Sequence, residues 1–175
     1  MSRISESQRE AVRQRAAGRC EYCRKPDLVS TYGYHVDPVI PLAHGGSSVL
    51  PNLAWACFEC NVGKGRDVAS YDQVTQKLTP LYPPRTGAWD DHFVLRGARL
   101  VGITATGRVT VNLLALNAPD QLETRQLLRE IERGLRQLTD AAYSHSHSTL
   151  RSNRSCLSKA SPRKAKTFRA GIPMS

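Results

Sequence analysis

The sequence lacks any apolar run that approaches the roughly 20 residues needed to cross a bilayer, so we expect no membrane partner. Its N-terminal segment, MSRISESQRE, has no apolar h-region, and we therefore expect no secretory leader. These absences favour a cytoplasmic location, where thiols stay reduced and paired cysteines are metal ligands more often than disulfides. No internal repeat is visible in the 175 residues, which are expected to form one domain with appendages. The sequence favours no particular oligomeric state.

Acidic residues are scarce, because 15 Asp and Glu stand against 25 Lys and Arg, for a net charge of +10. Residues 151–175 contain seven cations and no acid, which leaves a net charge of only +3 for residues 1–150. A basic chain points to an anionic partner, most simply nucleic acid. The basic tail has two interpretations: it binds the phosphate backbone, or it is an extension without a role.

Cysteine is also infrequent, but four of the five cysteines form two Cys-x-x-Cys pairs. Cys20 and Cys23 make the first pair, and Cys57 and Cys60 make the second. Two such pairs predict a tetrahedral four-thiolate site that holds a structural Zn²⁺ ion. A redox role is the alternative, and the presence of two pairs disfavours it. Cys156 lies in the tail and is expected to be a free thiol.

Local sequence patterns predict an α+β fold. Residues 5–17 are expected to form a helix with a capping box, since Ser5 precedes Gln8 and Ser7 precedes Glu10 by three positions. The remaining predicted elements are a strand at 32–40, a short helix at about 52–66, strands at 93–95, 100–103 and 109–114, and a long helix at 117–138. That long helix has an apolar stripe formed by Leu128, Ile131, Leu135 and Leu138.

These elements divide the chain into three expected parts. Residues 1–70 form a module around the cysteine pairs, with the N-terminal helix. Residues 71–140 form a small β extension and the long helix. Residues 141–175 are rich in Ser, Arg and Lys with little apolar content, so we expect a basic, disordered tail.

The segment around the cysteine pairs carries an ordered set of polar motifs. They are His35-Val-Asp37, Ile40-Pro41, His44-Gly45-Gly46, Asn52-Leu53, and then Asn61 and Lys64-Gly65 after the second pair. In this order, residues 10–70 resemble the HNH endonuclease family. The resemblance implies a ββα-metal hairpin-plus-helix with a four-cysteine zinc knuckle. It also implies that a separate catalytic cation, Mg²⁺ or Mn²⁺, binds the scissile phosphate of DNA.

Residue roles follow from the same resemblance. Asp37 and Asn61 are expected to ligate the catalytic cation, and Asn52 is expected to brace the catalytic loop by hydrogen bonds. The family places a histidine directly after the acid, where it acts as the general base that activates water. This chain has Pro38 at that position, and proline has no titratable group. Loss of a general base costs about 10²- to 10⁴-fold in rate, so we expect hydrolysis to be impaired.

Two other histidines stand near Asp37 in the sequence. His35 lies two residues before it, and His44 lies beyond the turn. Either is able to replace the missing base only if its imidazole reaches the attacking water. The alternative is that His35 packs locally and that His44 orders its own loop.

Several further residues are candidates for contact with DNA. Lys64, Arg66 and Arg24 border the expected site, where they either contact phosphates or form a solvated face. Residues 84–93 resemble an extension that follows the HNH module in some bacterial proteins. Within it, Trp89 and Phe93 are expected to be core anchors, and Arg85 and His92 are further candidates for DNA contact.

The predicted function is that of a metal-dependent DNA endonuclease of the HNH type, which hydrolyses phosphodiester bonds with activity impaired by Pro38. The alternative is a zinc-stabilised nucleic-acid-binding protein without catalysis.

Overall fold

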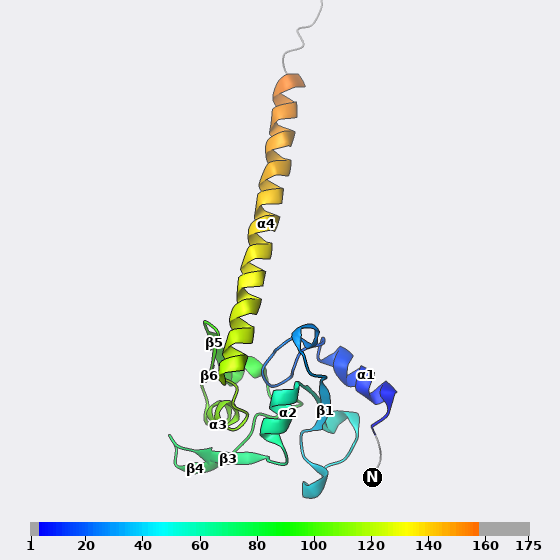
Figure 1. Ribbon diagram of the computed structural model, residues 1–175, viewed down its shortest axis with the longest axis vertical. Coiled ribbons are helices and arrows are strands. Elements are labelled where there is room, and N and C mark those ends of the chain that lie inside the picture. Colours follow the sequence, from blue (N-terminus) through cyan, green and yellow to red (C-terminus); the bar gives the residue numbers. More distant parts are fainter. Residues whose placement is uncertain (1–3, 158–175) are drawn as a thin grey trace, which may run out of the picture. The chain divides into compact units, whose positions relative to one another are not determined.

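The computed structural model describes residues 4–157, with the side chains of residues 4–140 (Figure 1). Its contacts divide the chain into two units, Met1–Glu130 and Ile131–Ser175. The helices are α1 (Glu6–Arg15), α2 (Phe58–Lys64), α3 (Ala105–Leu113) and α4 (Pro119–Leu157). The strands form three antiparallel pairs: β1 (His35–Pro38) with β2 (Leu53–Ala56), β3 (Ala69–Asp72) with β4 (Lys77–Pro80), and β5 (Phe93–Arg96) with β6 (Arg99–Gly102). The fold is therefore α+β, as the sequence predicts.

Helix α1 begins at the predicted capping box. The Ser5 hydroxyl accepts a hydrogen bond from the Gln8 backbone N–H at 3.2 Å, and the Gln8 side chain accepts one from the Ser5 N–H at 3.0 Å. The helix buries Val12 completely and packs against β2. The chain leaves the helix through Gly18, whose φ of +64° suits glycine, and enters the first cysteine pair.

The site is built on β1, β2 and α2. Strands β1 and β2 pair so that Asp37 lies opposite Ala54 and Pro38 opposite Leu53, at the end of the ladder, where a proline is tolerated. All four residues of β2 are buried, and α2 follows β2 directly. The sequence predicted a helix from about residue 52. The structure instead places residues 53–56 in a strand, because their apolar side chains form the core behind β1.

A second prediction was wrong: residues 109–114 were expected to form a strand, but residues 109–113 lie in helix α3. The Thr104 hydroxyl caps this helix by accepting a hydrogen bond from the Gly107 N–H at 3.0 Å. Val109 and Thr110 are buried, and the helix packs against β6 and β3. β-branched residues favour strands only weakly, and here the cap and the packing override that preference.

Helix α4 extends the predicted long helix at its C-terminal end. It continues through residues 141–157, where the sequence predicted a disordered tail, and residues 158–175 lie outside the described part. The predicted apolar stripe is largely exposed, since Ile131, Leu135 and Leu138 are each more than half accessible. Among residues 4–157, no helix is both long and apolar enough to cross a membrane.

Candidate functional site

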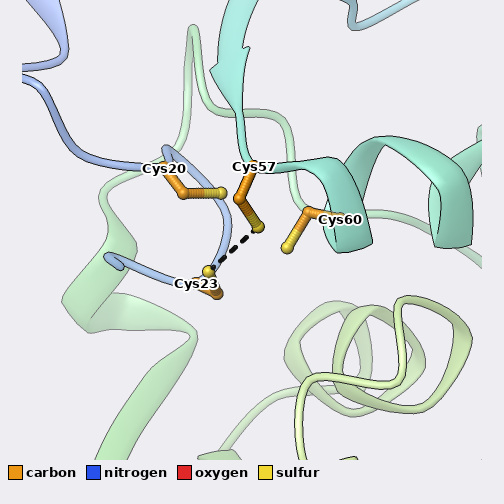
Figure 2. A group of neighbouring side chains, drawn as sticks. All are labelled: Cys20, Cys23, Cys57 and Cys60. Carbon is orange, nitrogen blue, oxygen red and sulfur yellow. Dashed lines mark hydrogen bonds between the residues drawn. The ribbon is translucent and has the colours of Figure 1, made fainter. Parts of the chain in front are cut away.

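The four paired cysteines lie together in the core, as Figure 2 shows. Cys20 and Cys23 come from the loop after α1, Cys57 immediately precedes α2, and Cys60 lies within that helix. All four are buried and reduced, and their sulfur atoms lie within 4.8 Å of one another. The Sγ atoms of Cys23 and Cys57 are 3.7 Å apart. A tetrahedral Zn²⁺ ion with Zn–S distances of about 2.3 Å requires sulfur separations of about 3.8 Å, so this cluster fits zinc.

A buried cation stands beside the cysteines. Lys25 is only 5% exposed and forms an ion pair with Glu59 at 2.7 Å. Burial lowers the pKa of Lys25, but Glu59 and the sulfurs of Cys57 and Cys23 more than offset this, so its pKa is raised. Four thiolates around Zn²⁺ carry a net charge of −2, and a lysine that stays charged compensates part of it. The surroundings therefore suit a charged metal–thiolate centre.

Asp37, the predicted ligand of the catalytic cation, lies in a closed polar pocket. It is 3% exposed, and both of its carboxylate oxygens accept hydrogen bonds. The Tyr22 hydroxyl donates to Oδ2 at 2.7 Å, and the Lys64 ammonium donates to Oδ1 at 3.1 Å. Burial raises the pKa of Asp37, and both Lys64 and Tyr22 oppose that shift. Burial and the nearby Asp37 charge also raise the pKa of Tyr22, so the phenol keeps the proton that it donates.

Lys64 also contacts the residue that departs from the family pattern. Its ammonium donates a second hydrogen bond to the Pro38 carbonyl oxygen at 3.0 Å, and the side chain of Lys64 is only 2% exposed. One lysine thus ties α2 to both Asp37 and Pro38. Both Asp37 oxygens accept one hydrogen bond each inside the protein, and each keeps a lone pair with which it could hold a cation.

Asn52 joins the two sides of the loop that follows β1. Its side-chain oxygen accepts a hydrogen bond from the Ile40 N–H at 2.9 Å, and its amide donates to the carbonyl oxygens of Ile40 and Ser47, both at 2.8 Å. Gly46 allows the close approach of these segments, because a Cβ atom at this position would lie 1.8 Å from the Ile40 oxygen. These bonds tie residues 40 and 47 of this loop to its end at Asn52.

The three histidines with described side chains all have partners away from Asp37. The exposed His35 ring lies 6.0 Å from the Phe58 ring, which also contacts the Tyr32 ring at 5.0 Å. His44 Nε2 is 3.0 Å from the Arg66 carbonyl oxygen, so this side chain connects its loop to the end of α2. His92 Nδ1 is 2.7 Å from the hydroxyl of Thr104, the residue that caps α3.

The other candidates divide between the core and the surface. Trp89 and Phe93 pack with their ring centroids 5.1 Å apart, as expected for core anchors. Arg85 forms an ion pair with the buried carboxylate of Glu21, and this pair compensates the charge of the Arg85 guanidinium inside the protein. Arg66 is exposed, and the exposed Arg24 lies over the Trp89 ring at 5.4 Å. Asn61 is half-buried on α2, one turn before Lys64.

Two residues of this site could not be assigned from the sequence. Tyr22 lies inside the first cysteine pair, and nothing in that motif indicates that its hydroxyl reaches Asp37. The sequence places Lys64 at the border of the site, whereas the structure buries it against Asp37. The signals for Lys64 were the Lys64-Gly65 motif and its position one turn after Asn61, which makes the two residues neighbours on the helix surface.

Comparison with models of protein families gives a match. Residues 20–67 match the model of the family described as HNH endonuclease. No curated protein and no solved structure matches the chain. The matched segment begins at Cys20 and contains the whole β1–β2–α2 unit with all four cysteines. Residues 20–67 are therefore similar to an HNH endonuclease module.

Proposed function

We propose that this chain is a DNA-binding HNH protein, of the type that includes metal-dependent endonucleases, in which phosphodiester hydrolysis is severely impaired. Pro38 is the observation that carries the proposal. It occupies the position of the general base in the hairpin, and it has no group that accepts a proton. The proposal that no described histidine replaces it is supported by their contacts, since His35, His44 and His92 each contact residues other than Asp37.

Binding does not depend on the missing base. The zinc cluster fixes the loop after α1 against β2 and α2, and the Asn52 hydrogen bonds fix the loop after β1. This frame presents the exposed Arg24 and Arg66 to solvent, and the last 25 residues add seven cations without an acid. Cations of this kind bind phosphates through counterion release, which gives affinity without sequence preference.

A second function, that of a nucleic-acid-binding protein without any catalysis, is favoured by the burial of Asp37. In this family the catalytic cation neutralises the charge that develops on the phosphate. A cation at that position would share the Asp37 carboxylate with the Tyr22 hydroxyl and the Lys64 ammonium, in a site that is almost closed to solvent. The two functions differ only in whether slow, cation-dependent cleavage remains.

Gel-shift and plasmid-nicking assays on the same zinc-loaded protein test the proposal. We expect DNA to shift without added divalent cation, and the affinity to fall steeply between about 50 and 200 mM salt. Replacing the seven cations of residues 151–175 by glutamine should lower the affinity and flatten the salt dependence. Nicking with Mg²⁺ or Mn²⁺ should be weak or absent. Failure to shift DNA at low salt would contradict the proposal, and so would fast, cation-dependent nicking.

A further inference from the structure

Arg125 is a charged side chain buried inside the unit that contains the four paired cysteines. It lies on α4 and is only 7% exposed. Its Nε donates a hydrogen bond to the Ala98 carbonyl oxygen at 2.6 Å, and its Nη2 donates to the Leu116 carbonyl oxygen and, at 3.2 Å, to Asn117 Oδ1. These acceptors are neutral, and the buried Nη1 has no hydrogen-bond partner in the described structure. Among the side chains of residues 4–140, no carboxylate forms an ion pair with this guanidinium.

Burial of this guanidinium requires a counter-charge from another source. A buried charge is costly because the protein interior replaces the water that would solvate it. Burial accordingly lowers the pKa of Arg125, and the sulfurs of Cys23 and Cys60 are the strongest opposing influence on that pKa. The exposed Asp120 opposes the shift less than these two sulfurs do. The cysteines are therefore the anionic groups that this guanidinium senses most strongly.

The turn between α3 and α4 places Arg125 on this side of the core. Leu114 and Leu116 of the turn are almost completely buried. Leu114 lies so close to α2 that a Cβ atom on Gly63 would be 3.0 Å from the Leu114 Cα atom. Gly63 follows Cys60 by three positions on α2. Because Arg125 binds the Leu116 carbonyl oxygen, it is held by the segment that packs against the helix carrying Cys60.

We propose that Arg125 is the buried counter-cation of the zinc–thiolate centre, and that zinc binding in turn holds the first turns of α4 in the core. Lys25, a second buried cation beside the cysteines, already shares its charge with Glu59. Arg125 has no such partner among the described side chains, so its charge remains to offset the net charge of −2 on Zn²⁺ with four thiolates. The inference goes beyond the proposed function, because it holds whether or not the chain cleaves DNA.

In this role Arg125 acts on the metal ligands without touching the metal. A positive charge near thiolates favours their deprotonated, metal-binding form. Residues that support metal ligands in this way typically contribute about 10- to 100-fold to metal affinity. A residue that only bound neutral carbonyl oxygens would not need a charge, since an uncharged donor avoids the cost of burying one.

Competition for Zn²⁺ between the full-length protein and a chelator of known affinity tests this inference. Arg125→Gln removes the charge and keeps an amide donor, whereas Arg125→Lys keeps the charge and loses the planar fork. Arg108→Gln is the matched control, because it breaks an ion pair with the buried Asp72 and shows how much zinc affinity is lost through destabilisation alone. We expect Arg125→Gln to bind zinc about 10- to 100-fold more weakly than this control, and Arg125→Lys to match the control.

The Co²⁺-substituted proteins provide a second readout that a purely structural role would not change. Loss of a nearby positive charge raises the energy of the sulfur electrons. The thiolate-to-Co²⁺ charge-transfer absorption should therefore move to lower energy in Arg125→Gln, and it should stay in place in Arg125→Lys and Arg108→Gln.

Two results would overturn the inference. One is a folded Arg125→Gln protein that loses no more zinc affinity than Arg108→Gln. The other is a charge-transfer absorption at the same energy in Arg125→Gln and Arg125→Lys, which would mean that Arg125 only holds its carbonyl partners. If Arg125→Gln does not fold with metal, Arg125→Met takes its place, because it keeps much of the side-chain volume and leaves no buried polar group.

Discussion

Loss of one zinc ligand is expected to unfold the unit that contains residues 20–67. Cys57 is completely buried at the junction of β2 and α2, in the same core as Val12 and Leu53. Structural zinc sites bind their metal with about 10–16 kcal/mol at neutral pH, and this binding energy is folding energy. The free energy of unfolding of a whole domain is only about 5–15 kcal/mol, so loss of zinc binding removes most or all of the stability.

The variant Cys57→Ser distinguishes the effect of losing zinc from the effect of changing the Cys57 side chain. A buried hydroxyl without a partner costs about 1–3 kcal/mol, which is too little on its own to unfold a typical domain. We therefore expect Cys57→Ser and the chelated wild type to lose zinc and far-ultraviolet circular dichroism signal together. Cys156→Ser, which changes the one cysteine outside the two pairs, should keep about one zinc per chain and the wild-type unfolding midpoint.

Elemental analysis measures the zinc content per chain, and chemical denaturation measures the unfolding midpoint. The reasoning fails if the purified wild type contains no zinc, or if it keeps its unfolding midpoint after chelation. It also fails if Cys57→Ser and Cys156→Ser are equally stable.

Two further predictions concern the frame around the site. Asn52→Ala removes three hydrogen bonds that hold the loop after β1, so the free energy of unfolding should fall by about 2–3 kcal/mol, whereas the exposed Asn112→Ala should change it little. Equal denaturation midpoints for these two variants would show that the loop does not depend on Asn52. Arg108 and Thr75 hold the pKa of Asp72 well below its usual range, so Asp72 stabilises the fold above about pH 4, and this contribution is lost as the pH falls through its folded pKa. The difference in unfolding free energy between the wild type and Asp72→Asn should therefore shrink below about pH 4, and a difference that stays constant down to pH 2 would contradict this.

The cysteine site was predictable because its signal is local and chemically specific, whereas the hairpin followed only from the resemblance of the ordered motifs to a known family, since the local pattern at residues 53–56 favoured a helix. Two Cys-x-x-Cys pairs have few uses other than a metal, and the polar motifs between them occur in a fixed order. The capping box of α1 was predictable for the same reason, since Ser5 and Gln8 satisfy each other's backbone within four residues.

The remaining errors come from contacts between distant residues. Residues 109–113 contain β-branched side chains that favour a strand, yet the Thr104 cap and burial against β6 make them helical. The Lys64–Asp37 pair joins residues 27 positions apart, and the Tyr22–Asp37 hydrogen bond joins residues 15 positions apart. No periodicity or spacing rule links such positions, so the hydrogen-bond partners of Asp37 became visible only in the folded chain.

The central claim is that Pro38, at the position of the general base, blocks hydrolysis in a frame that still binds DNA. The most direct measurement is the plasmid-nicking rate of Pro38→His relative to the wild type, at equal DNA occupancy and in Mn²⁺. We predict a rate at least about tenfold above the wild type, because the variant regains an imidazole next to Asp37 in the sequence, and we predict that Asp37→Asn in the same background abolishes the gain. A wild type that nicks as fast as Pro38→His would contradict the claim. So would a Pro38→His protein that is folded, zinc-loaded and bound to DNA but nicks no faster than the wild type.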